Sequence, residues 1–283
     1  MKVFIGIDIG GSTTKAAGMN ETGDLIGTLQ VTADDPRTST YGVLGRFLEQ
    51  NRLTLNDVAE ITLTGMGATF FHEDIYGIST RHADELASIG QGGLKVAGLD
   101  EALVVSMGTG SAFIRASKSN GTRYLGGSGV GGGTLSGLAS RFLHQTNIFT
   151  LSEMAMKGDR AMADLRIGDM QDDDLPSLNA ELTAANFGKI KSGATDYDMA
   201  AALFNMIYET VGVMAVFALK DDSARDIVLT GSLACLPPAK VTFDVFNRLK
   251  EVFGVNFIIP PNAAFATAIG SLLSSPFLPE AQK

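Results

Sequence analysis

The stretch GGSGVGGGTLSGL at residues 126–138 has glycine at seven of its first twelve positions. Because glycine has no Cβ, consecutive glycines let backbone N–H groups converge on a bound ligand. Leu135, Leu138 and Phe142 then recur at helical spacing, which predicts that this loop leads into a helix. A helix start presents unpaired N–H donors and the positive end of the helix dipole. The stretch is therefore typical of a phosphate-binding site.

Two short strands are predicted just before this loop. Residues 102–107 (ALVVSM) and 112–117 (AFIRAS) are apolar runs separated by the loop Gly108-Thr109-Gly110-Ser111. The second run ends at Ser119-Asn120-Gly121, which is a hairpin signal. The glycine-rich stretch thus follows a strand pair that carries a second glycine-containing turn.

The beginning of the chain has a related arrangement. Residues 3–9 (VFIGIDI) predict a buried strand that ends at the Gly/Ser/Thr loop 10–15, followed by two further strand-like runs. Asp8 lies at the end of the buried strand beside Gly10-Gly11. We therefore favour a role for its side chain in binding a metal–nucleotide complex over the alternative that it only caps the turn. Lys15 taken alone would be a surface lysine.

The two halves of the chain repeat one pattern. Each half has a hairpin with a Gly-Ser/Thr loop, at 10–15 and 108–111, and a later strand that ends in Thr-Gly, at 64–65 and 230–231. Two such halves facing each other would place both loops against one polyphosphate. We therefore expect an α/β chain with an N-terminal lobe at 1–101 and a C-terminal lobe at 102–283.

Asp84 and Glu85 form the one acidic pair close to a predicted helix start in the first lobe. An acid in the first turn is favoured by the helix dipole whatever its function. A catalytic base is the other interpretation of Glu85, and the residues alone do not separate the two.

Composition excludes several classes of protein. The 283 residues carry a net charge of −9 and no basic run, which argues against nucleic acid or an anionic membrane surface as partner. Cys235 is the single cysteine and the three histidines lie far apart, so neither a disulfide nor a zinc site is expected. We expect no signal peptide and no membrane span, hence a soluble cytoplasmic protein.

A long helix is predicted at residues 197–220. Its apolar side includes Met206, Val211 and Phe217, and it is widened beyond one stripe by Val213 and Val216. If this apolar side is wider than contact with one core requires, part of it would be left exposed in a monomer. The helix therefore predicts a homodimer.

Taken together, DIGGSTTK, SMGTGS and LTGSL resemble the phosphate and adenosine motifs of the actin-like ATPase and sugar-kinase superfamily. More closely, GGSGVGGGTLSGL, KGDR at 157–160, LTAANFG at 182–188 and AFATAIGSLL at 264–273 resemble the type II (eukaryotic-like) pantothenate kinases. The likeness covers nearly the whole chain. It implies a two-lobed actin-like (duplicated ribonuclease H-like) fold, with the nucleotide in the interlobe cleft. It also implies a homodimer and phosphorylation of the pantothenate hydroxyl with MgATP, the first step of coenzyme A biosynthesis.

The resemblance implies roles for the residues at matching positions. Glu85 would be the catalytic base, Asp8 would hold Mg²⁺ through water, and Thr109, Arg123 and Tyr124 would lie near the acceptor. Phosphoryl transfer needs these functions: charge neutralisation, positioning and a carboxylate that accepts the hydroxyl proton. The residues that would contact the nucleotide are Asp8, Gly10, Gly11, Ser12, Lys15, Gly108, Thr109, Gly110, Gly131, Gly132, Gly133, Thr134, Gly231 and Ser232.

Two departures from the family pattern lie on the acceptor side. Tyr124 stands where the family usually has an arginine that contacts the acceptor, with Arg123 one residue earlier, and Ala112 replaces a serine. A small shift of the hairpin would let Arg123 substitute, or the acceptor would be a relative such as pantetheine or an amino sugar. A regulatory pseudokinase that binds nucleotide or acyl-CoA is a further alternative. An activator ATPase of dehydratases would need cysteines for an iron–sulfur cluster, which Cys235 alone does not provide.

Overall fold

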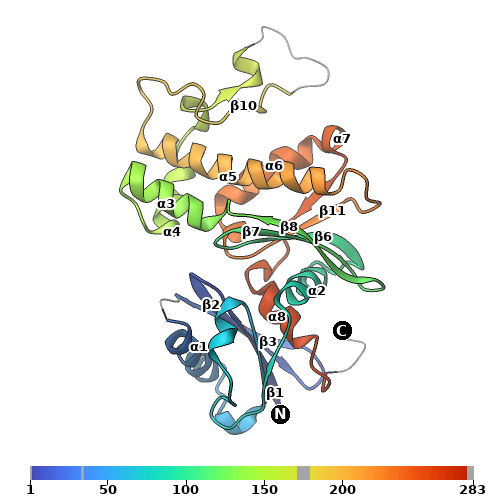
Figure 1. Ribbon diagram of the computed structural model, residues 1–283. Coiled ribbons are helices and arrows are strands. Elements are labelled where there is room, and N and C mark those ends of the chain that lie inside the picture. Colours follow the sequence, from blue (N-terminus) through green and yellow to red (C-terminus); the bar gives the residue numbers. More distant parts are fainter. Residues whose placement is uncertain (1, 33–34, 171–178, 279–283) are drawn as a thin grey trace.

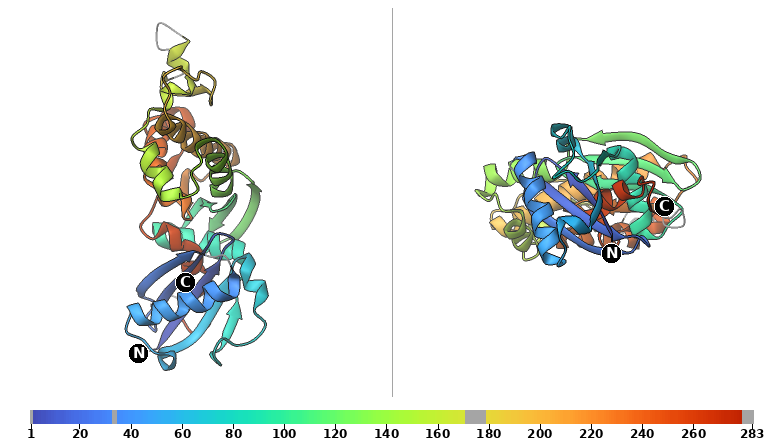
Figure 2. Two further views of the ribbon diagram at one scale, coloured as in Figure 1. Left: turned by 90° about the vertical axis from the view of Figure 1, so that its left-hand side faces the viewer. Right: turned by 90° about the horizontal axis from the view of Figure 1, so that it is seen from below.

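The computed structural model describes residues 2–32, 35–170 and 179–278. Within these residues the chain forms two lobes, each built on a five-stranded sheet and placed one above the other along an elongated molecule (Figures 1 and 2). A smaller two-stranded sheet projects beyond the upper lobe (Figure 1).

The first sheet has the strand order β3-β2-β1-β4-β5. Helix α1 (Pro36–Gln50) covers one face of this sheet, where Val43, Leu44 and Phe47 pack on alternate residues of the central strand. The predicted buried strand at 3–9 is confirmed. The five strands are β1 Val3–Ile9, β2 Thr13–Asn20, β3 Leu25–Thr32, β4 Val58–Thr64 and β5 Thr80–His82.

The second sheet belongs to the lobe drawn at the top of Figure 1, here called the upper lobe, and has the order β12-β11-β6-β7-β8. Its strands are β6 Glu101–Met107, β7 Ser111–Ser117, β8 Gly121–Ser128, β11 Asp226–Thr230 and β12 Asn256–Ile258. The core on one face is formed with helices of the upper lobe. These helices are α3 Gly132–Leu143, α4 Ile148–Ala155, α5 Asp196–Ala218, α6 Pro237–Arg248 and α7 Lys250–Phe253.

The two large sheets have the same topology. In each, three sequential strands pair as antiparallel neighbours, the first strand then pairs in parallel with the fourth, and the fourth with the fifth. The order β3-β2-β1-β4-β5 in the first sheet therefore corresponds, strand by strand, to β8-β7-β6-β11-β12 in the second. The duplication predicted from the repeated loops is confirmed.

Helices α2 (Glu85–Ala97) and α8 (Ala266–Leu272) lie between the two sheets and pack against each other (Figure 1). The helix α2 covers the second sheet, whereas α8 packs on the first sheet beside Phe4 and Met19. The end of the described chain thus contributes to the core of the lobe formed by its beginning. A lobe boundary at residues 101/102 stays a prediction.

The projecting sheet pairs β9 (Leu165–Arg166) with β10 (Thr183–Ala185). It joins the upper lobe through a buried polar cluster, in which Asp164 is fully buried and accepts a hydrogen bond from the side-chain amide of Asn205. The helix predicted at 197–220 is α5, which begins after the capping residue Thr195.

Candidate active site

A cavity of about 630 Å³ opens between the two sheets, at the end where the strand-connecting loops of both lobes meet. It brings together residues from the turn after β1, the β6–β7 turn, the start of α3 and the turn after β11. Of the residues predicted for the site, the lining contains Asp8, Gly10, Gly11, Ser12, Lys15, Glu85, Gly108, Thr109, Gly110, Tyr124, Gly132, Gly133, Gly231 and Ser232.

The turns at residues 10–15 and 108–111 touch across the cavity. The hydroxyls of Ser12 and Thr109 lie 3.2 Å apart, although 97 positions separate them in the sequence. Each loop belongs to one of the two duplicated hairpins, so the contact joins equivalent turns of the two lobes. A polyphosphate bound here would meet both loops, which is the arrangement that the repeated pattern predicted.

Asp8 and Lys15 form an ion pair on neighbouring strands of the first sheet. They are register partners on β1 and β2, their charged atoms lie 3.7 Å apart, and both residues are buried. Burial raises the pKa of the Asp8 carboxyl, and the charge of Lys15 offsets part of that rise. Because 3.7 Å exceeds the length of a charge-assisted hydrogen bond, this pair leaves the carboxylate able to take a stronger partner.

The glycine-rich loop packs on the β6–β7 turn. The N–H groups of Gly132 and Gly133 donate to the carbonyl oxygens of Gly108 and Thr109, each at 2.8 Å. The N–H of Gly131 donates to the hydroxyl of Thr134, which itself donates to the carbonyl oxygen of Gly129 at 2.6 Å. Unpaired N–H donors were expected at this helix start, and for these three glycines that expectation is wrong. The loop instead fixes the shape of its neighbour.

This packing explains why glycine is needed at position 131. A Cβ there would lie 2.8 Å from backbone atoms of Gly110, closer than real contacts allow. Gly131 and Thr134 do not line the cavity themselves. They hold the turn that does, whereas Gly132 and Gly133 reach the cavity surface.

The turn after β11 closes the other side of the cavity. Gly231 has a φ of 89°, which favours glycine, and a Cβ there would lie 2.4 Å from the carbonyl oxygen of Met107. The next residue, Ser232, has its hydroxyl 3.2 Å from the side-chain oxygen of Gln30 on β3. A residue of the upper lobe thus contacts the lower lobe beside the cavity.

Glu85 is the first residue of α2, and its half-buried side chain faces the cavity. The helix cap is provided by Asp84, whose carboxylate accepts the N–H of Ala87 at 2.7 Å. In the part of the chain that the structure describes, no hydrogen bond or ion pair to the Glu85 carboxylate occurs. Burial, and then the negative charges of Asp8 and Asp84, raise the pKa of Glu85 above its ordinary value. The carboxylate is therefore free to act as a proton acceptor.

Tyr124 and Arg123 lie on opposite faces of β8. Tyr124 lines the cavity and lies over Gly127, where an added Cβ would be 2.7 Å from the tyrosine hydroxyl. Arg123 pairs in register with Arg115 and lines a separate hollow on the other face. Neighbouring strand residues point to opposite faces, and a one-residue shift would reverse every side chain of the strand. The structure therefore does not bring Arg123 to the cavity.

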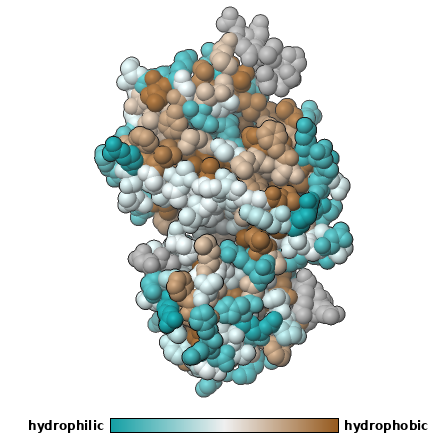
Figure 3. All heavy atoms as spheres, in the orientation of Figure 1, coloured by the Kyte–Doolittle hydropathy of each residue, from teal (hydrophilic) through white to brown (hydrophobic). Residues whose placement is uncertain are grey.

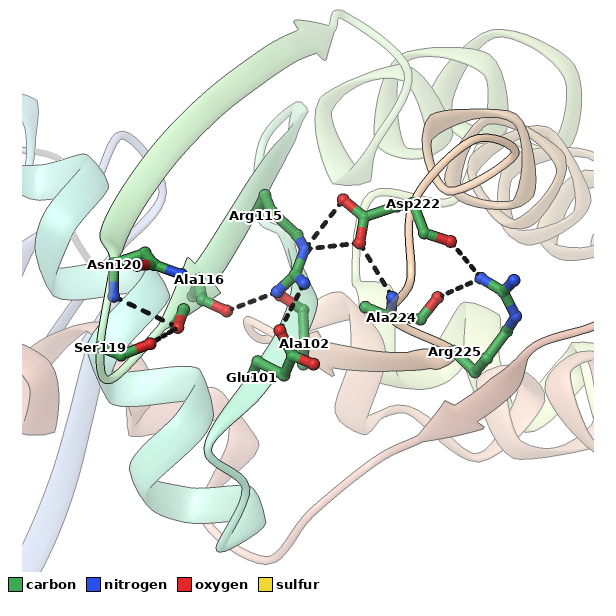
Figure 4. Close-up of polar contacts among 10 residues, drawn as sticks. Glu101, Ala102, Arg115, Ala116, Ser119, Asn120, Asp222, Ala224 and Arg225 are labelled. Carbon is green, nitrogen blue, oxygen red and sulfur yellow. Dashed lines mark hydrogen bonds and ion pairs between the residues drawn. The ribbon is translucent and has the colours of Figure 1, made fainter.

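The hollow beside Arg123 is a structural ion cluster (Figure 4). The Nε of Arg115 donates to both carboxylate oxygens of Asp222, at 3.1 and 3.0 Å, and its Nη2 donates to Glu101 at 2.6 Å. These bonds join β6 and β7 to the loop after α5. The cluster stabilises the back of the sheet, away from the cavity.

Sequence reasoning missed the apolar part of the lining. Met66, Ile89 and Ile148 reach the cavity from three different elements, as does Ser106 on β6. Ile89 and Ile148 lie outside every glycine-containing motif, so no local signal marked them. Met66 stands between Gly65 and Gly67, and Ser106 begins the SMGTGS stretch. Ala112, noted as a departure from the family pattern, also lines the cavity.

Comparisons with known proteins agree with the sequence motifs. The model of the family described as Fumble matches residues 100–245. A type II pantothenate kinase of Oceanobacillus iheyensis is 32% identical over 176 residues, which cover 61% of this chain and 64% of that protein. A type II pantothenate kinase of Staphylococcus aureus strain USA300 is 28% identical over 281 residues, covering 95% of this chain and 98% of that protein.

Solved structures agree with the fold. The activator of the 2-hydroxyisocaproyl-CoA dehydratase from Clostridium difficile with bound ADPNP superimposes with a TM-score of 0.67. The match covers 95% of this chain and 92% of that chain, at 14% sequence identity. Likeness at that identity supports the two-lobed fold alone.

Proposed function

The chain belongs to the Fumble family, and from that premise we propose that it is an ATP-dependent type II pantothenate kinase. The matched segment spans 64% of the length of the O. iheyensis relative. The observation that carries the proposal is the Glu85 carboxylate, free of partners in the described structure, in the same cavity as two paired phosphate loops. This is what transfer of a phosphoryl group to an alcohol requires.

ATP would lie between the lobes, with its phosphates between the loops at Gly10–Ser12 and Gly108–Gly110. Lys15 is the one cation among the described residues that line the cavity, so it would meet the phosphate charge. The turn at Gly231-Ser232 and the start of α3 would line the nucleoside end. The solved neighbour that carries ADPNP has the same two-lobed fold, which is consistent with a nucleotide in this cleft.

The residues fit a magnesium ion that arrives with the nucleotide. Among the described residues no cluster of three or more metal-ligating side chains is present, so an all-protein cage is not available. Mg²⁺ in phosphoryl-transfer sites is held by one or two carboxylates plus substrate phosphates and water, and Asp8 beside the first loop provides such a carboxylate. When bound, the ion neutralises the developing charge on the phosphates.

Glu85 would act as general base. The acceptor hydroxyl oxygen forms a bond to the γ-phosphorus while the bond from that phosphorus to the bridging oxygen of ADP breaks. The hydroxyl proton passes to the Glu85 carboxylate, and ADP leaves with the electrons of the broken bond. A raised pKa suits a base whose task is to accept a proton near neutral pH.

The same reaction on an uncharged acceptor is the second candidate. Among the described residues, the cavity has Lys15 as its cation, and that residue is already paired with Asp8. The side chain over the acceptor end would be Tyr124, which offers a hydroxyl where the family usually has a guanidinium. This lining therefore also suits an acceptor without a carboxylate, such as pantetheine, as the second candidate.

ADP release by the purified protein tests both candidates. We expect release that depends on Mg²⁺ and on an added acceptor, with pantothenate and pantetheine as the active compounds and N-acetylhexosamines inactive. Asp8→Asn should reduce the magnesium-dependent part of the ADP release, because the amide lacks the charge that orders the ion and its water. Activity with an amino sugar alone would place the chain with the sugar kinases, and no acceptor-dependent release would contradict kinase function.

We further propose a homodimer through α5, in the cytoplasm. This helix is the one in the described chain that is long and apolar enough to cross a membrane, yet 56% of its most apolar window is buried inside the protein. Phe217 on the same helix is 70% exposed, and on the face drawn in Figure 3 the upper lobe carries more apolar surface than the lower one. Contact with a second copy would cover that surface.

A further inference from the structure

The hydroxyl of Thr64 is an exception among the buried threonines. Thr64 is the last residue of β4 and only 1% exposed, and its Oγ1 has no hydrogen-bond partner among the described residues. By contrast, Thr14 pairs with Ser39 at 2.8 Å and Thr40 with the carbonyl oxygen of Pro36 at 2.7 Å. A buried hydroxyl without a partner costs folding free energy, and valine would fill the same space without that cost.

Thr64 lies directly beside Asp8. The strands β1 and β4 are parallel, and their register pairs Asp8 with Thr64, so the two side chains emerge on the same face of the sheet. The residue after Thr64 confirms how tightly this strand end approaches the carboxylate. A Cβ on Gly65 would lie 2.7 Å from Oδ1 of Asp8.

Among the described residues, the Asp8 carboxylate has one charged partner, Lys15, at 3.7 Å. A carboxylate that is to meet a metal ion is normally oriented by further hydrogen bonds, and loss of such a partner costs about 10–100-fold in metal affinity or activity. Thr64 is a hydroxyl donor of the right type, in a neighbouring register position and without another task in the described structure.

We propose that Thr64 is a positioning residue for Asp8. In the nucleotide-bound state its hydroxyl donates a hydrogen bond to the Asp8 carboxylate, directly or through one water, and so fixes the orientation in which Asp8 meets the magnesium of MgATP. The inference rests on the proposed function, because it assigns Thr64 a part in the use of that ion.

Thr64→Val removes the hydroxyl and keeps the shape of the side chain. Calorimetry of ADP binding at a series of Mg²⁺ concentrations should show that half-maximal binding needs about 10–100-fold more Mg²⁺ than in the wild type. Binding of ADP without Mg²⁺ should be unchanged. The melting temperature should stay equal or rise, and Thr64→Ser should restore the magnesium dependence.

Thr230→Val is the matched control. Thr230 occupies the equivalent position at the end of β11, is equally buried and precedes Gly231, but its hydroxyl already contacts the carbonyl oxygen of Val105 at 3.5 Å. The Thr230→Val substitution should leave the magnesium dependence of ADP binding as in the wild type.

The inference is overturned if Thr64→Val keeps the wild-type magnesium dependence, or if it lowers the melting temperature and weakens metal-free ADP binding equally. Wild-type protein whose ADP binding ignores Mg²⁺ would instead refute the proposed function, and the inference with it.

Discussion

At the scale of single residues, Glu85 carries the proposed chemistry. Glu85→Gln keeps the size of the side chain but removes the proton acceptor, so we expect kcat to fall by about 10²–10⁴-fold with nucleotide affinity nearly unchanged. A base works only when deprotonated, so kcat/KM should rise with pH through the pKa of Glu85. Because that pKa is raised, the fall on the acid side should begin above the pH expected for an exposed glutamate, about 4.3. The variant should lose this limb of the pH profile.

Asp84→Ala provides the control for the helix start. Asp84 caps α2, so its loss should lower stability by about 0.5–2 kcal/mol while turnover stays close to wild type. Steady-state kinetics and thermal unfolding of both variants separate the two roles. Wild-type turnover in Glu85→Gln, with only a small change in stability, would end the catalytic assignment.

The sequence allowed some residue positions to be predicted and not others. Asp8 and Lys15 face each other because a strand, a tight turn and a second strand fix their register within one hairpin. Arg123 was placed near the acceptor by its position in the chain, but strand alternation turns it toward Arg115. The N–H groups of Gly132 and Gly133 donate to a turn more than twenty residues away in the sequence, so no local pattern could show that those donors are used.

At the scale of elements, the crossing of α2 and α8 holds the lobes together. A Cβ on Gly270 would lie 1.9 Å from the carbonyl oxygen of Ser88, and one on Gly92 would lie 1.8 Å from that of Ala266. Both contacts are with backbone, which cannot move aside without separating the helices. We expect Gly270→Ala to destabilise the protein by about 1–3 kcal/mol or more, as measured by urea unfolding.

Gly45→Ala in α1 is the matched control. Nothing lies within 4 Å of a Cβ added there, and the position is exposed inside a helix. The substitution should raise stability by up to about 1 kcal/mol through helix propensity alone. An unchanged unfolding midpoint for Gly270→Ala would show that α2 and α8 can move apart without loss of stability. The contact between α2 and α8 joins segments far apart in the chain, so no local signal could predict it.

At the scale of the whole molecule, duplication was predictable because it repeats local features: a glycine-containing hairpin turn and a later strand that ends in Thr-Gly. The packing of α8 on the first lobe was not predictable, since it depends on how the chain returns after both sheets have formed.

The homodimer through α5 stays a prediction. Light scattering at micromolar concentration should give a dimer mass. Phe217→Ser, which removes an exposed aromatic side chain of α5, should shift the population toward monomer.

Phe70→Ser is the comparison for the dimer. Phe70 is also exposed, at 52%, but belongs to the first lobe, so the dimer should persist. A monomer mass for the wild-type protein would rule the homodimer out.

The central claim is that the interlobe cavity transfers a phosphoryl group to an alcohol. Mass spectrometry of the acceptor after incubation with the purified protein, MgATP and pantothenate tests it most directly. We expect phosphorylated pantothenate in amounts equal to the ADP formed, and almost none with Glu85→Gln. ADP formed at the same rate with or without acceptor, and no phosphorylated pantothenate, would contradict it and indicate an ATPase with this fold.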